Sequence, residues 1–181
     1  MNKSKAKAFL SGAMLLGLTA SLASVPGLPG SGGGAVYAAT SSTSKSSAKQ
    51  MAAVYAKIQA ENAAKVVALV NVERKNAGLK PLVVHTNLTK MAKDKAVDMY
   101  KNKYFSHTSP KYGSPFDMMD AYNITYLYAG ENIAKGQKTP ADVVAAWMDS
   151  PGHKANILNS KYTLIGVGYY NGHWVQEFIG K

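Results

Sequence analysis

The sequence contains no cysteine among its 181 residues. This absence excludes a disulfide framework, a lipoprotein anchor, and every metal site or nucleophile that depends on a thiol. Two hydrolase patterns are missing as well, since no serine lies in a G-x-S-x-G nucleophile elbow and no H-E-x-x-H zinc motif occurs. The fold must therefore be held by its hydrophobic core, and any chemistry must come from other side chains.

Acidic residues are scarce, with 10 Asp and Glu against 21 Lys and Arg and a formal net charge of +11 at pH 7. A surface this basic favours polyanionic partners, here cell-wall polymers or anionic lipid head groups. In the alternative interpretation, the excess of lysine only keeps a secreted protein soluble. We do not expect nucleic acid as a partner, because no recognised binding motif is present.

Residues 1–39 have the organisation of a secretory signal peptide. A short lysine-containing segment precedes the uncharged stretch Ala8–Val25, which a Pro/Gly segment beginning at Pro26 ends. The small residues of Ala35–Ala39 then suit signal peptidase. The alternative is a membrane anchor, but Ser, Thr and Gly interrupt the apolar stretch. Cleavage after Ala38 or Ala39 removes three lysines and no acid, which leaves a net charge of +8. We expect a secreted bacterial protein, not integral to the membrane after cleavage, that its basic surface can retain at the cell wall.

The remainder of the chain is predicted to hold one domain. Residues 40–60 are a Ser/Lys-rich segment, interpreted as a flexible linker with a helical extension as the alternative, and residues 61–181 suit a single core. Apolar periodicity and capping residues predict helices. These cover Glu61–Asn76, Leu88–Asn102 with Asn87 as its N-cap, Pro115–Tyr122, and a segment that begins at Thr139. Two β-like segments, Tyr162–Tyr170 and His173–Ile179, flank Asn171-Gly172, which is a strong hairpin signal.

One group of polar residues has the side chains that metal binding or acid–base catalysis requires. The stretch Gly130–Leu158 reads GENIAKGQKTPADVVAAWMDSPGHKANIL and places Glu131 and His153 at the two ends of a predicted helix, and His107 lies upstream before a Pro-containing loop. His153 falls at the start of a short helix, where the dipole disfavours an added proton and favours the neutral imidazole. If the three side chains converge, they can hold Zn²⁺ with a water at an open position, or act without metal as an acid–base pair.

Other titratable residues receive structural interpretations. Asp94 and Asp98 are four residues apart and resemble a chelating pair, but lysines flank them, so a solvated, salt-bridged helix face is predicted. His85 and His173 lack a comparable setting and are interpreted as ordinary loop or hairpin residues.

Four ordered motifs carry a family resemblance: FSHTSP from Phe105, GENIA from Gly130, SPGHKANIL from Ser150 and IGVGYY from Ile165. Together they resemble the bacterial branch of the CAP superfamily, also called SCP-like, over about Asn62–Lys181. The resemblance implies an α+β fold, a three-layer α/β/α sandwich with a small antiparallel sheet. It also implies a motif of an Asn and an Arg one turn apart, which Asn71 and Arg74 match. We expect a structural role for both, with Arg74 binding either a carboxylate or main-chain carbonyls.

The resemblance further implies a cleft with two histidines and two acids. His107, Glu131 and His153 match three members, whereas Ser150 stands at the fourth position and Asp149 directly before it. Asp149 is therefore the expected fourth metal ligand, and Asp117 is a second candidate.

The expected function is that of a secreted CAP-domain protein whose His/Glu/His cleft binds a divalent cation, such as zinc, or a small ligand at the cell envelope without turnover. Its metal ligands would be His107, His153, Glu131 and Asp149. The first alternative is a peptidase- or esterase-like hydrolase with Glu131, His153 and His107 as catalytic candidates. The second is an interaction module that binds wall polymers or lipid.

Overall fold

The computed structural model describes residues 33–181, with side chains from residue 45 onward. The predicted signal peptide falls mainly on residues 1–32, outside the described residues. Helix α1 spans Gly33–Asn76, so the segment 40–60, predicted as a linker or a helical extension, is helical. Within the described part of the chain, none of the helices combines the length and apolar composition that a membrane crossing requires.

Four more helices and four strands complete the described structure. The helices are α2 (Thr86–Lys101), α3 (Pro115–Ala121), α4 (Pro140–Asp149) and α5 (Pro151–Ile157). The strands are β1 (Val83–Val84), β2 (Tyr128–Lys135), β3 (Leu164–Tyr170) and β4 (His173–Gly180). They form one sheet in the order β1-β3-β4-β2, which leaves β2 at an edge. Because β1 pairs parallel with β3, the sheet is mixed, whereas an antiparallel sheet was expected.

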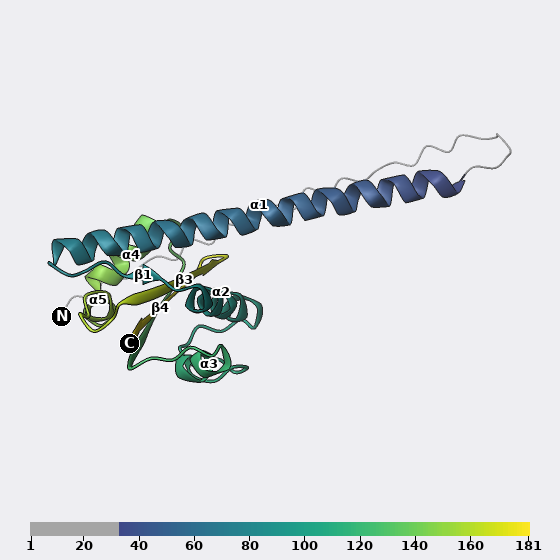
Figure 1. Cartoon of the computed structure of the whole chain (residues 1–181). Helices are drawn as coiled ribbons and strands as arrows, with labels where there is room; N and C mark the ends of the chain where they lie inside the picture. The colour runs from purple at the N-terminus through teal and green to yellow at the C-terminus, as the bar shows by residue number, and fades with distance from the viewer. Residues whose placement is uncertain (1–32) are drawn as a thin grey trace, which may run out of the picture. The chain divides into compact units, whose positions relative to one another are not determined.

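Side-chain alternation along the strands builds a core on each face of the sheet. On β4, Trp174 and Phe178 pack with apolar residues of α1, α4 and α5. The alternate residues Val175 and Ile179 face the other way, toward α2 and α3. Figure 1 shows α2 and α3 on one side of the sheet and α4 and α5 on the other. The predicted three-layer α/β/α sandwich is therefore confirmed.

The hairpin between β3 and β4 forms where Asn171-Gly172 predicted it. Both residues have positive φ, 42° and 77°, as the tight two-residue turn requires. On β3, Gly166 and Gly168 let α2 approach closely, because a Cβ at either position would lie 2.3 Å from a backbone carbon of Leu88 or Ala92. These glycines bring α2 down onto the sheet beside the site described below.

The start of α2 differs from the prediction. The helix begins at Thr86 and its N-cap is His85, whose Nδ1 accepts a hydrogen bond from the Leu88 amide at 3.2 Å. The helix thus begins two residues earlier than predicted, and an imidazole nitrogen rather than the Asn87 side chain caps one of its unpaired amides. His85 is a capping residue rather than an ordinary loop residue.

Arg74 joins three segments of the chain. Its buried guanidinium donates to the carbonyls of Lys80 (2.9 Å), Ile157 (2.8 Å), Asn159 (2.9 Å) and Tyr162 (3.2 Å). Asn71, one turn earlier, bonds both the carbonyl and the amide of Leu82 at 3.0 and 2.8 Å. The structural role expected for both residues is confirmed, and Arg74 binds main-chain carbonyls rather than a carboxylate.

Candidate functional site

Glu131 lies in the middle of the edge strand β2, not at the end of a helix as predicted. The error has a local cause, because the short GENIA motif lacks the alternation that marks a strand. On β2, Ile133 packs against α2, so Glu131, two residues away, projects to the same face. Its side chain is only 3% exposed.

The neighbours of Glu131 anchor helix α5 to the sheet. Asn132, on the opposite face of β2, donates from Nδ2 to the His153 carbonyl at 3.1 Å and to Gln176 Oε1 at 3.0 Å. Asn156 of α5 donates back to the Asn132 side chain at 2.8 Å and to the Glu131 carbonyl at 3.2 Å. These buried amide contacts bring the start of α5, and His153 with it, to the edge of the sheet where Glu131 lies.

His107 forms a direct pair with Glu131. The imidazole Nδ1 lies 2.6 Å from Glu131 Oε1, and the His107 side chain is 55% exposed. The hydrogen bond to Glu131 raises the pKa of His107, while partial burial and the nearby ammonium of Lys95 oppose this shift. The site therefore presents an accessible imidazole held by a buried carboxylate.

The loop that carries His107 is anchored from below by α2. Lys95 is fully buried and donates from Nζ to the His107 carbonyl. Burial lowers the pKa of Lys95, and the carboxylates of Glu131, Glu177 and Asp98 counteract this shift. A buried ammonium thus lies beneath the site and compensates its carboxylates.

Asp98 organises the same loop. It accepts hydrogen bonds from Asn102 Nδ2 (2.6 Å), Tyr104 Oη (2.5 Å) and Ser109 Oγ (2.7 Å), and is only 6% exposed. The prediction of a solvated, salt-bridged face is wrong for Asp98. It holds for Asp94, which pairs with Lys90 at 2.9 Å.

His153 is the third residue of α5, as predicted. Its Nδ1 lies 2.9 Å from Ser150 Oγ. Burial lowers the pKa of His153, and the positive charge of His107 lowers it further. The expected shift toward the neutral imidazole is present, although burial rather than the helix dipole leads it.

The two acids expected from the sequence have other surroundings. Asp149 is the exposed last residue of α4. Asp117 is exposed and forms the capping box of α3, accepting from the Ser114 amide and hydroxyl at 2.7 Å each. Ser150, at the aligned position, contacts His153 through its hydroxyl.

The acid beside Glu131 is Glu177, which sequence reasoning missed. Glu177 lies directly across from Glu131 in the β2–β4 pairing and is fully buried, so the Glu131 carboxyl is the group that faces it across the two strands. Burial, followed by the adjacent charge of Glu131, raises its pKa well above the usual range. We therefore assign Glu177 as the protonated member of the pair. Its signal was a glutamate inside an otherwise largely apolar strand.

Comparison with known proteins identifies the family. The model of the cysteine-rich secretory protein family, CAP, matches residues 67–178. The chain belongs to the CAP family. This CAP domain holds its layers together without the cysteines that the family's description mentions.

Two curated relatives come from Bacillus subtilis. The chain is 58% identical to YkwD over 119 residues, covering 65% of this chain and 46% of YkwD. It is 37% identical to the membrane protein YlbC over 125 residues, covering 69% of this chain and 36% of YlbC. The match thus spans less than half the length of either relative.

Solved structures support the same fold. An extracellular SCP-domain protein from Bacillus anthracis superposes with a TM-score of 0.67 at 33% identity, over 68% of this chain and 42% of that one. An outer surface protein from Borrelia burgdorferi superposes with a TM-score of 0.62 at 25% identity, over 67% of this chain and 93% of that one.

The metal-ligating side chains of this CAP domain bear on the prediction that it binds zinc. Among residues 33–181, no group of three or more His, Asp or Glu side chains is arranged to hold a metal ion. The bonding explains this, because Glu131 is engaged with Nδ1 of His107 and Glu177 is buried beneath. The remaining candidate donors are the imidazoles of His107 and His153, with Glu131 as the carboxylate that orients His107. The four-ligand set predicted from the sequence stays a prediction.

Proposed function

We propose that this chain is a secreted CAP-domain protein of the cell envelope that binds a divalent cation through His107 and His153 without turning over a substrate. The observation that carries the proposal is the 2.6 Å contact between His107 Nδ1 and the buried Glu131 carboxylate. The signal-peptide pattern supports secretion, as do the extracellular and outer-surface descriptions of the similar structures.

The bonding of each imidazole favours this function. A histidine that binds metal usually donates its other ring N–H to a carboxylate, a carbonyl or another oxygen, which fixes the tautomer and orients the ring. Glu131 meets this requirement for His107, and Ser150 Oγ is the corresponding partner for His153. Within the described part of the chain no hydrogen bond to Nε2 of either imidazole is present, so Nε2 is the atom that we propose binds the cation.

The charge of the site predicts how binding depends on pH. The pKa of His107 is raised, so protons compete with a cation for this imidazole. His153, whose pKa is lowered, is available as a neutral ligand at lower pH. Affinity for the cation should therefore rise as the pH rises through the pKa of His107.

Isothermal titration with Zn²⁺ tests the proposal. We expect His107→Ala and His153→Ala each to weaken binding, and Glu131→Gln to weaken it about 10- to 100-fold, as is typical when an orienting partner is lost. Asp149→Asn is the matched control, because Asp149 was a ligand in the sequence prediction but is exposed at the end of α4. Equal heats of binding for the wild type and the His107→Ala/His153→Ala double variant would refute cation binding at these two histidines.

A second candidate is a hydrolase of the peptidase or esterase class. It is favoured by the accessible imidazole of His107 on a buried carboxylate, an arrangement that can take a proton from an attacking water. Hydrolysis of peptide and ester libraries, compared between the wild type, Glu131→Gln and the control Asp149→Asn, tests it. An observed rate that is unchanged in Glu131→Gln would exclude the dyad as its source.

A further inference from the structure

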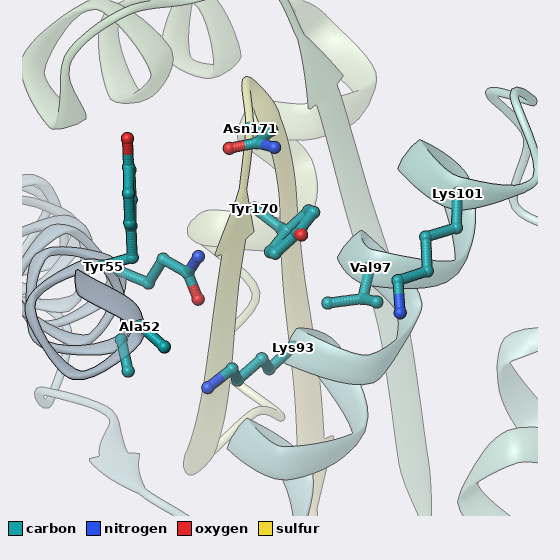
Figure 2. A pocket seen from close by; sticks show the side chains of 9 residues that line it. Ala52, Tyr55, Lys93, Val97, Lys101, Tyr170 and Asn171 are labelled. Atoms are coloured by element: carbon teal, nitrogen blue, oxygen red, sulfur yellow. The ribbon is translucent and has the colours of Figure 1, made fainter. Parts of the chain in front are cut away.

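A groove of about 530 Å³ lies apart from the His107 site, between α1, α2 and the β3–β4 turn. Figure 2 shows Ala52 and Tyr55 of α1 on one side, Lys93, Val97 and Lys101 of α2 on the other, and Tyr170 and Asn171 between them. Ala56 and Gln59 complete the lining. None of these residues belongs to the candidate cation site.

The charged side chains of the groove are cationic. Lys93 and Lys101 are eight residues apart on α2, which places their backbones about 12 Å apart along the helix axis. Both are exposed and neither forms an ion pair with a described residue, in contrast to nearby Lys90, which pairs with Asp94. No Asp or Glu lines the groove. Lys93 interacts with Asp94 only through its charge, and two spaced ammonium groups without an ion pair suit a ligand that carries repeated negative charge.

The other groups suit sugar or polyol units between those charges. Tyr55 is 57% exposed and offers an aromatic surface with a hydroxyl. Tyr170 is held by an edge-on contact with Tyr100, with ring centroids 5.2 Å apart. Gln59 and Asn171 add amides that both donate and accept hydrogen bonds.

We propose that this groove binds a polyanionic chain of phosphodiester-linked sugar or polyol units. Lysine ammonium groups bind phosphate as point charges, while the tyrosines and amides contact the uncharged units. The groove is recessed between two helices, so it suits a narrow chain better than a flat lipid surface. The proposal goes beyond cation binding and does not depend on it.

Binding of the secreted chain to purified poly(glycerol phosphate) tests the proposal, with phosphatidylglycerol vesicles and polyglutamate as comparison probes. Lys93→Gln/Lys101→Gln should weaken polymer binding at least about tenfold, since two charge-assisted contacts are lost. Tyr55→Ala should weaken it several-fold. The matched control Lys75→Gln/Lys138→Gln removes the same charge from exposed positions outside the groove. We expect less than about a twofold change there and none in His107→Ala, because distant exposed charges are largely screened.

Several outcomes would overturn the assignment. An equal loss in the two lysine pairs would mean that the basic surface acts diffusely. Unchanged polymer binding in Tyr55→Ala would show that the Tyr55 ring does not contact the polymer. Equal affinity for polyglutamate would show that charge alone is recognised, and binding to vesicles but not to the polymer would assign the surface to a membrane. Cation titration of the lysine variants separates this proposal from the first, since their Zn²⁺ binding should match that of the wild type.

Discussion

Replacing Glu177 with Gln should stabilise the protein at neutral pH and leave it unchanged in acid. Glu177 is fully buried opposite Glu131, and burial raises its native pKa well above the unfolded value of 4.5. The native state therefore retains a proton that the unfolded chain releases. The free energy of unfolding consequently falls as the pH rises between the unfolded and the native pKa of this carboxyl.

The size of the effect follows from the linkage between proton binding at Glu177 and folding. Across that window the wild type loses about 1.4 kcal/mol of stability for every pH unit. Gln keeps the shape of the protonated side chain, supplies an N–H toward the Glu131 carboxylate, and does not titrate. The groups that face position 177 are Glu131 from β2 and Lys95 from α2. Both remain in the variant, so the difference between the two proteins isolates Glu177.

Urea unfolding of the wild type and Glu177→Gln at a series of pH values from about 4 to 8 measures this difference. The advantage of Glu177→Gln should be near zero at the acid end and grow with pH. Glu61→Gln is the control, because Glu61 is exposed and pairs only loosely with Lys57 at 3.9 Å. A stability difference that does not change with pH would refute the assignment of Glu177 as the protonated acid.

Three further predictions concern the scaffold and the dyad. Arg74→Met should cost about 3–5 kcal/mol in urea unfolding because it leaves buried carbonyls unpaired, and an effect below about 1 kcal/mol would contradict this. Gly130→Ala should lower the free energy of unfolding by about 1–3 kcal/mol, since the new Cβ would lie 2.4 Å from Tyr162 Oη. In a double-mutant cycle, Tyr162→Phe should relieve part of that loss, and strictly additive effects would argue against the clash. NMR titration should show that the pKa of His107 lies above the ordinary histidine value of 6.5. The stabilisation from the His107–Glu131 pair is then fully present below pH 6.5 and is lost as the pH rises through the native pKa. An unchanged His107 pKa in Glu131→Gln would contradict the pairing.

Some functional residues follow local rules and others do not. His153 falls near the start of a short helix because Ser-Pro-Gly precedes it, and that placement is readable from residue types alone. Lys95 and Glu177 each interrupt an apolar pattern, on the buried face of α2 and on β4, without any local sign of their partners. The buried ammonium of Lys95 is tolerated because the Glu131 carboxylate lies nearby, and Glu177 is tolerated because its raised pKa keeps it protonated. Only the packing of α2 on the sheet brings these groups together.

The residue order by itself determined the α5 start and the Asn171-Gly172 hairpin, because each depends on dihedral preferences close along the chain. The family motifs were likewise readable from residue types alone. Only the tertiary structure decided that Glu131 lies in an edge strand, that its acidic neighbour is Glu177 rather than Asp149, and that Asp98 is buried. Those facts arise from strand pairing and helix packing between segments far apart in sequence. Such long-range pairing selects which polar group lies beside which, and no local pattern encodes it.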